Sequence, residues 1–313
     1  MTTVDEALDL RPGQWVEVRS EAELSATLDA DGTLDGLPWM PEMRQYCGRR
    51  FRVQARADRT VVERLGVRRM RNTVHLAGLR CDGGAHGGCA RGCLLFWKEA
   101  WLRLAAPAAR SSLSETPPAG SPRAPATRDG DGYVCQATQL DRATSHQPLL
   151  DLGQYLRAPA AEQVSPWLLL ASAAILVYDL AQALRGGREW NTLSGPCTRT
   201  PTVILGLQPG ERVRVKSRRE ILATLDQRGW NHGMEFSREM LAYCGRELTV
   251  LRRVDRLLRD QTNRMIEVKH TVILEGAVYR ALNRRAVPRA EYMFWRECWL
   301  ERVEAREAAA PAT

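Results

Sequence analysis

The chain has 313 residues, which is enough for two or three domains, and it carries a formal net charge of +8. This charge permits contact with nucleic acid, anionic lipid or a phosphorylated or sulfated ligand, but it does not select one of these partners. Eight cysteines are too few for a disulfide scaffold, and the acidic start of the sequence lacks the apolar core of a signal peptide. We therefore expect a protein of the reducing cytoplasm, where clustered cysteines favour a metal ion over disulfides.

A Pro-Gly turn at residues 12–13 leads into an alternating apolar segment around Trp15, which is a common opening of small β-barrels. Ser20 and Glu23 have the spacing of a capping box, so a helix is predicted to begin there and to end by Gly32. Alternation predicts further strands, at residues 51–55, 61–67 and 73–79.

A short glycine-rich loop then brings together three cysteines and one histidine, which are Cys81, His86, Cys89 and Cys93. A tetrahedral zinc site needs four nitrogen or sulfur ligands, and gaps of two to four residues let one loop curl around an ion. The glycines permit the positive φ angles that such curvature requires. We predict a metal site here, with zinc preferred over iron. The alternatives are a loop of reduced thiols with a solvent-facing histidine, and a disulfide.

Four further residues bear on this site. Asp82 and His75 could orient the ligands, although the position of His75 between Val74 and Leu76 favours an ordinary strand residue. Cys47 and Cys244 lie in identical Tyr-Cys-Gly-Arg segments, and we expect them to be buried structural thiols rather than ligands.

The middle of the chain contains one long apolar segment. Ser165 and Pro166 have the pattern of a helix start, and Gly186 and Gly187 end the helix. Its uncharged apolar run, residues 167–178, is too short to span a bilayer. We favour a buried packing helix. The alternative is a peripheral membrane contact through residues 165–185, with flanking arginines, and a membrane span is the least favoured.

The firmest pattern is an internal duplication of about ninety residues. A shift of 197 places Ser20 on Ser217 and the first Tyr-Cys-Gly-Arg segment on the second, and a shift of 198 places Trp97 on Trp295. The chain is therefore predicted to comprise an SH3-like repeat with the metal loop at 1–104, a disordered linker at 105–132, a helical spacer at 133–203, an SH3-like repeat without the loop at 204–304 and a disordered tail at 305–313.

Each copy serves as a control for the other. Tryptophans repeated in both copies are expected in the cores, and these are Trp97, Trp101, Trp295 and Trp299. Glu42 and Glu239 are also shared, and we expect each to cap a turn or pair with a nearby arginine. The four candidate ligands are replaced in the second copy by Tyr279, Arg284, Val287 and Glu291. The fold therefore does not require the metal in general.

The Pro-Gly-led repeats, the Tyr-Cys-Gly-Arg segments and the terminal Phe-Trp-x-Glu-x-Trp-Leu segments together resemble a bacterial family of duplicated small β domains that carry Cys/His loops. The resemblance covers both repeats and the middle helix. It implies SH3-like barrels, which mostly bind peptides, nucleic acids or other proteins, and it implies no activity. Relatives in that family also carry cysteines at the positions of Tyr279 and Val287, so this chain departs from the pattern in its second copy.

We therefore expect a mainly β protein with some α structure, in which tandem SH3-like barrels and a structural zinc serve a binding or scaffold role. The protein partner or anionic ligand is not specified. Whether the chain is an enzyme is left open: a metal-dependent enzyme is an alternative, with Asp82, His75 or Glu99 as the base. A nucleic-acid-binding module is possible but not favoured, because few aromatic residues accompany the basic ones. Its basic surface would comprise Arg68, Arg69, Arg71, Arg252, Arg253 and Arg256.

Overall fold

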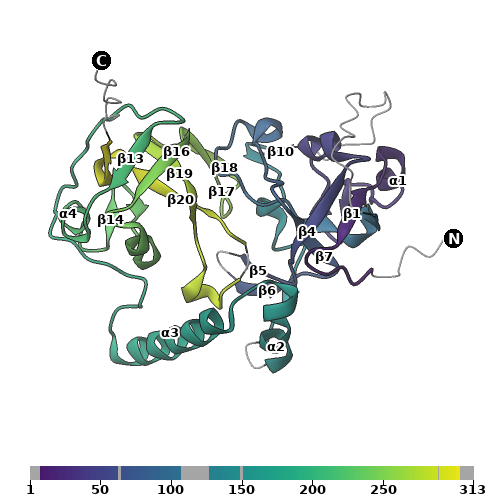
Figure 1. Cartoon of the computed structure of the whole chain (residues 1–313), viewed down its shortest axis with the longest axis horizontal. Coiled ribbons are helices and arrows are strands. Elements are labelled where there is room, and N and C mark those ends of the chain that lie inside the picture. Colours follow the sequence, from purple (N-terminus) through teal and green to yellow (C-terminus); the bar gives the residue numbers. More distant parts are fainter. Residues whose placement is uncertain (1–7, 63–64, 107–126, 149–150, 288, 304–313) are drawn as a thin grey trace, which may run out of the picture. The chain divides into compact units, whose positions relative to one another are not determined.

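The computed structural model describes residues 8–62, 65–106, 127–148, 151–287 and 289–303 (Figure 1). The structure is mainly β with some helices, and this coarse prediction of fold class is confirmed. The chain forms two compact units. Unit 1 takes in the chain up to Leu180 together with Arg256–Glu267 and Tyr279–Glu291, and unit 2 takes in Ala181–Asp255, Val268–Val278 and the chain from Tyr292.

Unit 1 is built on a five-stranded antiparallel sheet in the order β8-β7-β4-β1-β9. Its strands are β1 (Trp15–Val18), β4 (Arg50–Arg56), β7 (Thr73–Leu76), β8 (Trp97–Lys98) and β9 (Leu102–Leu104). In β1 the apolar residues Val16 and Val18 are buried while their neighbours are partly exposed, which is the alternation seen in the sequence. The predicted capping box is confirmed, because Ser20 and Glu23 cap α1 (Glu21–Ser25) reciprocally.

Shorter elements complete unit 1. Its other strands include β2 (Thr33–Leu34), β3 (Leu37–Pro38), β5 (Arg59–Val62), β6 (Gly66–Arg69), β10 (Arg128–Asp129), β11 (Gly132–Tyr133), β12 (Ser145–His146), β17 (Arg256–Arg259) and β18 (Arg264–Glu267). Its helices include the 3₁₀ turns η1 (Pro41–Tyr46), η2 (Gly84–His86), η3 (Glu99–Trp101), η4 (Ala137–Gln139) and η6 (Leu282–Arg284), and the helix α2 (Leu152–Ala161). The prediction of one strand over 61–67 is wrong, because β5 and β6 pair there as a hairpin that turns before Gly66 (φ +73°).

Unit 2 repeats the strand order of the first sheet as β20-β19-β16-β13-β21. Its elements are β13 (Arg212–Val215), α4 (Arg218–Leu222), β14 (Trp230–Asn231), β15 (Met234–Glu235), η5 (Arg238–Tyr243), β16 (Glu247–Arg253), β19 (Thr271–Val278), β20 (Tyr292–Arg296), η7 (Glu297–Trp299) and β21 (Leu300–Arg302). The second capping box forms as the first does, with Ser217 and Glu220 at the start of α4.

The prediction that the four repeated tryptophans are core residues is confirmed, because all of them are fully buried. In unit 1 the ring of Trp39 packs edge-on against Trp97 and Trp101, with centroids 5.8 and 5.2 Å away. In unit 2 Phe236 occupies the equivalent place against Trp295 and Trp299, at 6.1 and 5.0 Å. An aromatic trio therefore forms each core.

The long helix in the middle of the chain is more exposed than the sequence predicts. Residues 107–126 of the predicted linker and the predicted tail at 305–313 lie outside the described residues. The long helix, α3 (Pro166–Arg185), has the predicted limits, but the prediction that it is buried is wrong. Only 11 % of its most apolar stretch is buried. The sequence pattern misleads because α3 is apolar on nearly all sides, whereas only one face, with Ser172 and Ile175 buried, packs on the protein.

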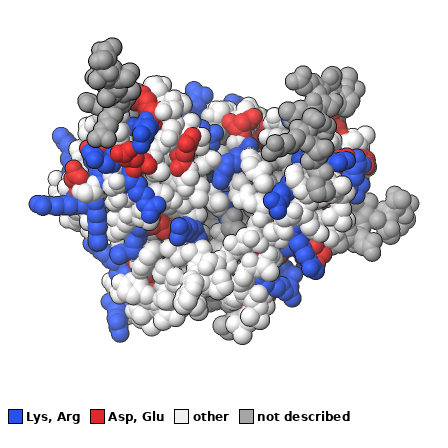
Figure 2. Space-filling view, viewed as in Figure 1, with Lys and Arg blue, Asp and Glu red and all other residues white. Residues whose placement is uncertain are grey.

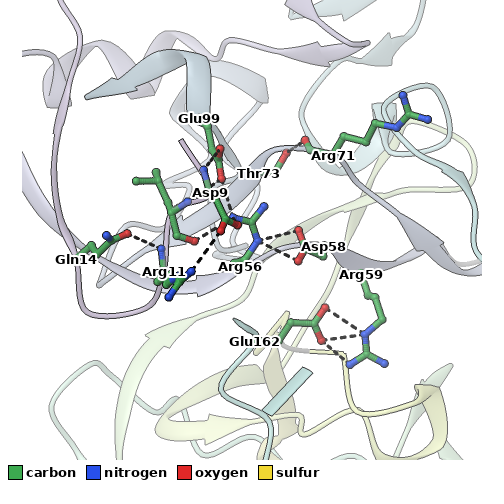
Figure 3. A network of polar contacts seen from close by, with 11 residues as sticks. Asp9, Arg11, Gln14, Arg56, Asp58, Arg59, Arg71, Thr73, Glu99 and Glu162 are labelled. Carbon is green, nitrogen blue, oxygen red and sulfur yellow. Dashed lines mark hydrogen bonds and ion pairs between the residues drawn. The ribbon is translucent and has the colours of Figure 1, made fainter. Parts of the chain in front are cut away.

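In each unit a buried glutamate binds the backbone of the segment that precedes the first strand of the five-stranded sheet. In unit 1 the carboxylate of Glu99 accepts hydrogen bonds from the backbone N–H groups of Asp9 (3.1 Å) and Leu10 (3.2 Å) and from Arg56 (2.7 Å) (Figure 3). In unit 2, Glu297 accepts them from the N–H groups of residues 205–207 and from Arg253. Burial raises the pKa of Glu297, but these donors outweigh burial and the net pKa is lowered.

We predict that Glu99→Gln and Glu297→Gln will each lower the free energy of unfolding by about 2 kcal/mol, because each removes a charge that several buried donors share. Urea denaturation followed by tryptophan fluorescence measures the loss. Glu301→Gln, which breaks the exposed pair with Arg214, is the control and should cost less than about 1 kcal/mol. Equal losses in all three variants would contradict the proposed role.

His75 lies inside the sheet of unit 1 and not on the surface. Its side chain is 1 % exposed, its Nδ1 is 3.0 Å from the carbonyl oxygen of Leu95, and its ring packs on Phe96. Burial lowers the pKa of His75 to about 4, so the ring is neutral at pH 7 and Nδ1–H donates to the carbonyl. Because the folded-state pKa lies below the unfolded value of 6.5, the unfolded chain binds the proton first as the pH falls.

We therefore predict that His75 contributes its full stability at neutral pH and loses it between about pH 6.5 and pH 4, by at most about 3 kcal/mol. Denaturation curves of the wild type and His75→Gln, measured at several pH values across this range, should converge towards low pH. His146→Gln, at an exposed position in β12, is the control. Parallel pH dependence of the wild type and His75→Gln would show that His75 does not carry this effect.

Candidate metal centre

The backbone of the predicted loop is held closed at its base and bent at its glycines. The N–H of Cys81 donates to the carbonyl oxygen of Cys93 (2.8 Å). Gly83 adopts φ +78°, and a Cβ there would lie 2.1 Å from the backbone oxygen of Cys89. Only glycine can therefore occupy position 83 without moving the loop. This bend turns the short helix η2 so that His86, its last residue, faces inwards and is 2 % exposed.

Three potential ligand atoms converge at this point. Atoms of Glu42, Cys81 and His86 all lie within 4.8 Å of one another. The Sγ of Cys81 is 3.4 Å from Oε1 of Glu42 and 3.6 Å from Nε2 of His86, and His86 Nδ1 is 3.8 Å from Glu42 Oε1. Glu42 reaches the cluster from the first turn of η1, which Pro41 begins. A carboxylate, a thiol and an imidazole are all ligands that zinc accepts.

The cluster borders a small cavity of about 20 Å³. Cys89, Cys93 and Cys135 also line this cavity, and Cys135 comes from the segment between β11 and η4. A volume of this size holds one water molecule or one ion. It is far smaller than the several hundred cubic ångströms of a typical substrate pocket.

Burial disfavours the charged forms of several of these donors. It raises the pKa of Glu42 and of Cys81, raises that of Cys93 to about 11 and of Cys135 to about 12, and lowers that of His86. Nδ1 of His86 and Oε2 of Glu42 are buried without a hydrogen-bond partner among the described residues. A cation in the cavity would satisfy these atoms and favour the thiolate forms.

The structure brings the predicted residues together to different degrees. Cys81 and His86 belong to the tight group, whereas Cys89 and Cys93 line the same cavity outside it. Asp82 turns away, and its Oδ1 accepts the N–H of Gly84 (2.8 Å). His75 contacts the backbone of Leu95, which lines the cavity, but does not line it itself. The partly buried thiols Cys47 and Cys244 also lie outside the cavity lining.

Two residues of the site were missed in the sequence. Glu42 was expected to cap a turn or pair with an arginine, but it faces Cys81 and His86 instead. The presence of an equivalent Glu239 suggested a structural role common to both copies and so concealed its place in the cluster. The sequence did not indicate that Cys135 belongs to the site, because this residue lies far from the loop along the chain and forms no ligand motif with it.

A hairpin from much later in the chain forms one side of the site within unit 1. The N–H of Ala90 donates to the carbonyl oxygen of Arg256 (2.9 Å), and the N–H of Leu258 lies 3.4 Å from the Sγ of Cys89. Arg91 pairs with Asp260 of the same β17–β18 hairpin. Arg289 and Glu291 extend this ion-pair group, since Arg289 lies 3.3 Å from Glu291 and 3.9 Å from Asp260.

The corresponding loop of the second copy keeps the backbone shape without the donors. Gly83, Gly87, Gly88 and Gly92 have positive φ, and the residues 198 positions later do so too, which are Ala281, Arg285, Ala286 and Ala290. Left-handed conformations cost residues other than glycine about 1 kcal/mol or more each. The loop conformation is therefore adopted even where side chains oppose it and no ligand set is present.

A separate cleft of about 960 Å³ lies in unit 1 and is rich in charge. The arginines that line it are Arg11, Arg56, Arg59, Arg69, Arg71 and Arg157. The innermost ones are already neutralised, because Arg56 pairs with Glu99 and Asp58, and Arg59 pairs with Glu162 (Figure 3). Arg68 of the predicted basic surface bonds to Thr144. These arginines therefore mainly form ion pairs and hydrogen bonds between segments of unit 1.

Comparison of the chain with protein-family models, with curated proteins and with solved structures finds no match. The resemblance to duplicated β domains with Cys/His loops therefore stays a prediction. The chemistry of the centre has to be inferred from its own donors, their burial and the size of the cavity.

We predict that the protein binds zinc at about one equivalent, and that Cys81→Ser and His86→Ala will each retain less than about a tenth of it, because both remove a donor from the tight group. Elemental analysis after reconstitution with zinc and removal of free metal measures binding. Cys47→Ser, which changes a thiol of unit 1 outside the cavity, should keep the metal. The same measurement on Glu42→Gln, Cys89→Ser, Cys93→Ser and Cys135→Ser identifies the remaining ligands. Metal retained by both principal variants, or absent from the wild type, would contradict the site.

Proposed function

We propose that this chain is a zinc-binding scaffold or binding protein, built from tandem SH3-like repeats, in which the ion has a structural role. The observation that carries the proposal is the convergence of Glu42, Cys81 and His86 within 4.8 Å beside a one-ion cavity lined by further thiols. The common strand order of the two sheets and their matching aromatic trios support the repeats. Iron is the second choice for the ion.

The burial of the centre favours a structural ion over a catalytic one. A catalytic zinc keeps one position open to substrate or water, and a substrate needs space beside it. The cavity here holds about 20 Å³, and the side chains of His86 and Glu42 are 2 % and 4 % exposed. A mononuclear ion fits this space better than an iron–sulfur cluster does.

The candidate bases for an enzyme are already engaged in the fold. Asp82 accepts the N–H of Gly84, His75 bonds to Leu95, and Glu99 binds backbone N–H groups and Arg56. A general base must be able to reach the proton that it removes. These contacts make the metal-dependent enzyme the weaker alternative. The nucleic-acid-binding alternative is also weaker, because the deepest arginines of the charged cleft are paired with carboxylates.

A structural ion at this place would join four segments that are distant in the sequence. The cavity is lined by Met40 and Glu42 at the start of η1, by the loop at 81–96, by Cys135 with its two following residues, and by Leu258 and Asp260 of the β17–β18 hairpin. Metal binding supplies folding free energy directly to such a junction.

We predict that a strong chelator will increase hydrogen exchange in three parts of unit 1, namely the loop at 81–93, the segment at 133–140 and the hairpin at 256–267. The N–H groups of Ala90 and Leu258 should exchange faster without the metal, because each bonds between the loop and the β17–β18 hairpin. Hydrogen–deuterium exchange with mass spectrometry, with and without zinc, measures the change. The strands β13 and β16 of unit 2 are the internal control. Uniform loosening of both units, or no change at 256–267, would argue against a local structural ion.

A further inference from the structure

The helix α3 has one less exposed face, which mixes apolar and polar residues. Leu168 and Leu169 pack against Ala158, Val164 and Ala286, and Ile175 is 7 % exposed. Ser172 is 4 % exposed, and its hydroxyl donates to the carbonyl oxygen of Leu282 (2.6 Å). This face attaches α3 to unit 1 and leaves the remaining apolar residues of the helix uncovered.

The opposite face of α3 is apolar and exposed. Its large side chains are between 46 % and 90 % exposed, and they are Trp167, Leu170, Val177, Tyr178, Leu180 and Leu184. Leu152 and Leu156 of the preceding helix α2 are exposed to a similar extent, at 70 % and 81 %. The surface over α3 is mostly white in Figure 2, which means that few charged side chains cover it. An apolar patch of this extent indicates an interaction site.

A lipid surface explains this pattern better than another protein copy does. The 20 residues of α3 contain two charged residues, Asp179 on the inner face and Arg185 in the last turn. Arg185 ends α3, the exposed Arg157 directly follows Leu156 in α2, and the chain as a whole has a net charge of +8. Apolar residues bordered by arginine fit acyl chains bordered by anionic headgroups.

The fold of unit 1 determines whether α3 can span a bilayer or only lie along its surface. By length and composition α3 is sufficient to cross a membrane. One crossing would separate the residues before Pro166 from those after Arg185. Yet segments after α3 belong to unit 1 with those before it, since Arg256 bonds to Ala90, and the guanidinium of Arg289 donates to the carbonyl oxygen of Val61 (3.0 Å). The chain segments before and after α3 therefore lie on the same side of the membrane.

We propose that α3 is an in-plane membrane anchor, which inserts its exposed apolar face into an anionic lipid surface while its less exposed face stays on unit 1. This proposal is independent of the metal centre, because no residue of α3 lines that cavity. It assigns to the chain an interaction surface for lipid, with the bilayer touching α3 and the leucines of α2.

The test is flotation of the full chain with vesicles of phosphatidylcholine, with and without phosphatidylglycerol. The wild type should float with the mixed vesicles and less with phosphatidylcholine alone. Val177→Glu/Leu180→Glu, at positions 67 % and 55 % exposed, should reduce the bound fraction about tenfold or more. Leu104→Glu/Ile204→Glu is the matched control, because these positions are 55 % and 67 % exposed and lie outside α3. Circular dichroism and tryptophan fluorescence should show that both variants fold.

Three results of the flotation test would overturn the proposal, and one result of a protease test would do so too. The wild type could remain unbound, or the α3 variant could float as well as the control. A wild-type dimer that the α3 variant converts to a monomer, without flotation of either, would show that a second copy covers the face. Trypsin added after cell-free synthesis with vesicles tests the orientation. Cleavage on both sides of α3 supports an in-plane helix, whereas protection of one side indicates a span and contradicts it.

Discussion

In unit 1 a group of buried side chains of the kind that bind metal ions shares a space large enough for one ion. Thiols, an imidazole and a carboxylate surround about 20 Å³, and two of their polar atoms have no hydrogen-bond partner among the described residues. Burying such atoms unpaired costs free energy, whereas an ion would turn the same atoms into its ligands. Four chain segments meet at this cavity, so the proposed ion would satisfy the donors and hold the segments together.

The sequence predicted the parts of the protein that depend on local spacing. Ser20 and Glu23 cap their helix because the capping box needs only three residues of separation. Cys81 and His86 meet because the glycines between them allow one loop to turn on itself. Glu42 and Cys135 could not be assigned in this way, since their proximity to the loop depends on tertiary packing. The exposure of α3 was also missed, because composition gives the apolarity of a helix but not which face meets the protein.

Comparison of the two five-stranded sheets separates the contacts that both units share from the donors that only one unit has. Glu99 and Glu297 bind equivalent backbone N–H groups and equivalent arginines, so these buried carboxylates serve the fold. The left-handed backbone positions also occur in both loops, although the second loop bears Ala and Arg where the first bears Gly. The donors, in contrast, occur only in the first loop. A backbone that already has the shape of a binding loop lets a few side chains create a site, because less ordering entropy opposes the ion.

The later loop and hairpin connect the metal centre to the orientation of α3. Both segments follow α3 in the chain and yet bond to residues that precede it, through Arg256, Asp260 and Arg289. An ion beside Leu258 would strengthen this closure and so make it harder for the chain to be divided by a bilayer. The apolar length of α3 alone would permit insertion across a membrane, but the closed unit removes that option. The in-plane arrangement that we propose agrees with this closure, because it leaves the covered face of α3 on unit 1 while the exposed face lies along the surface of the bilayer.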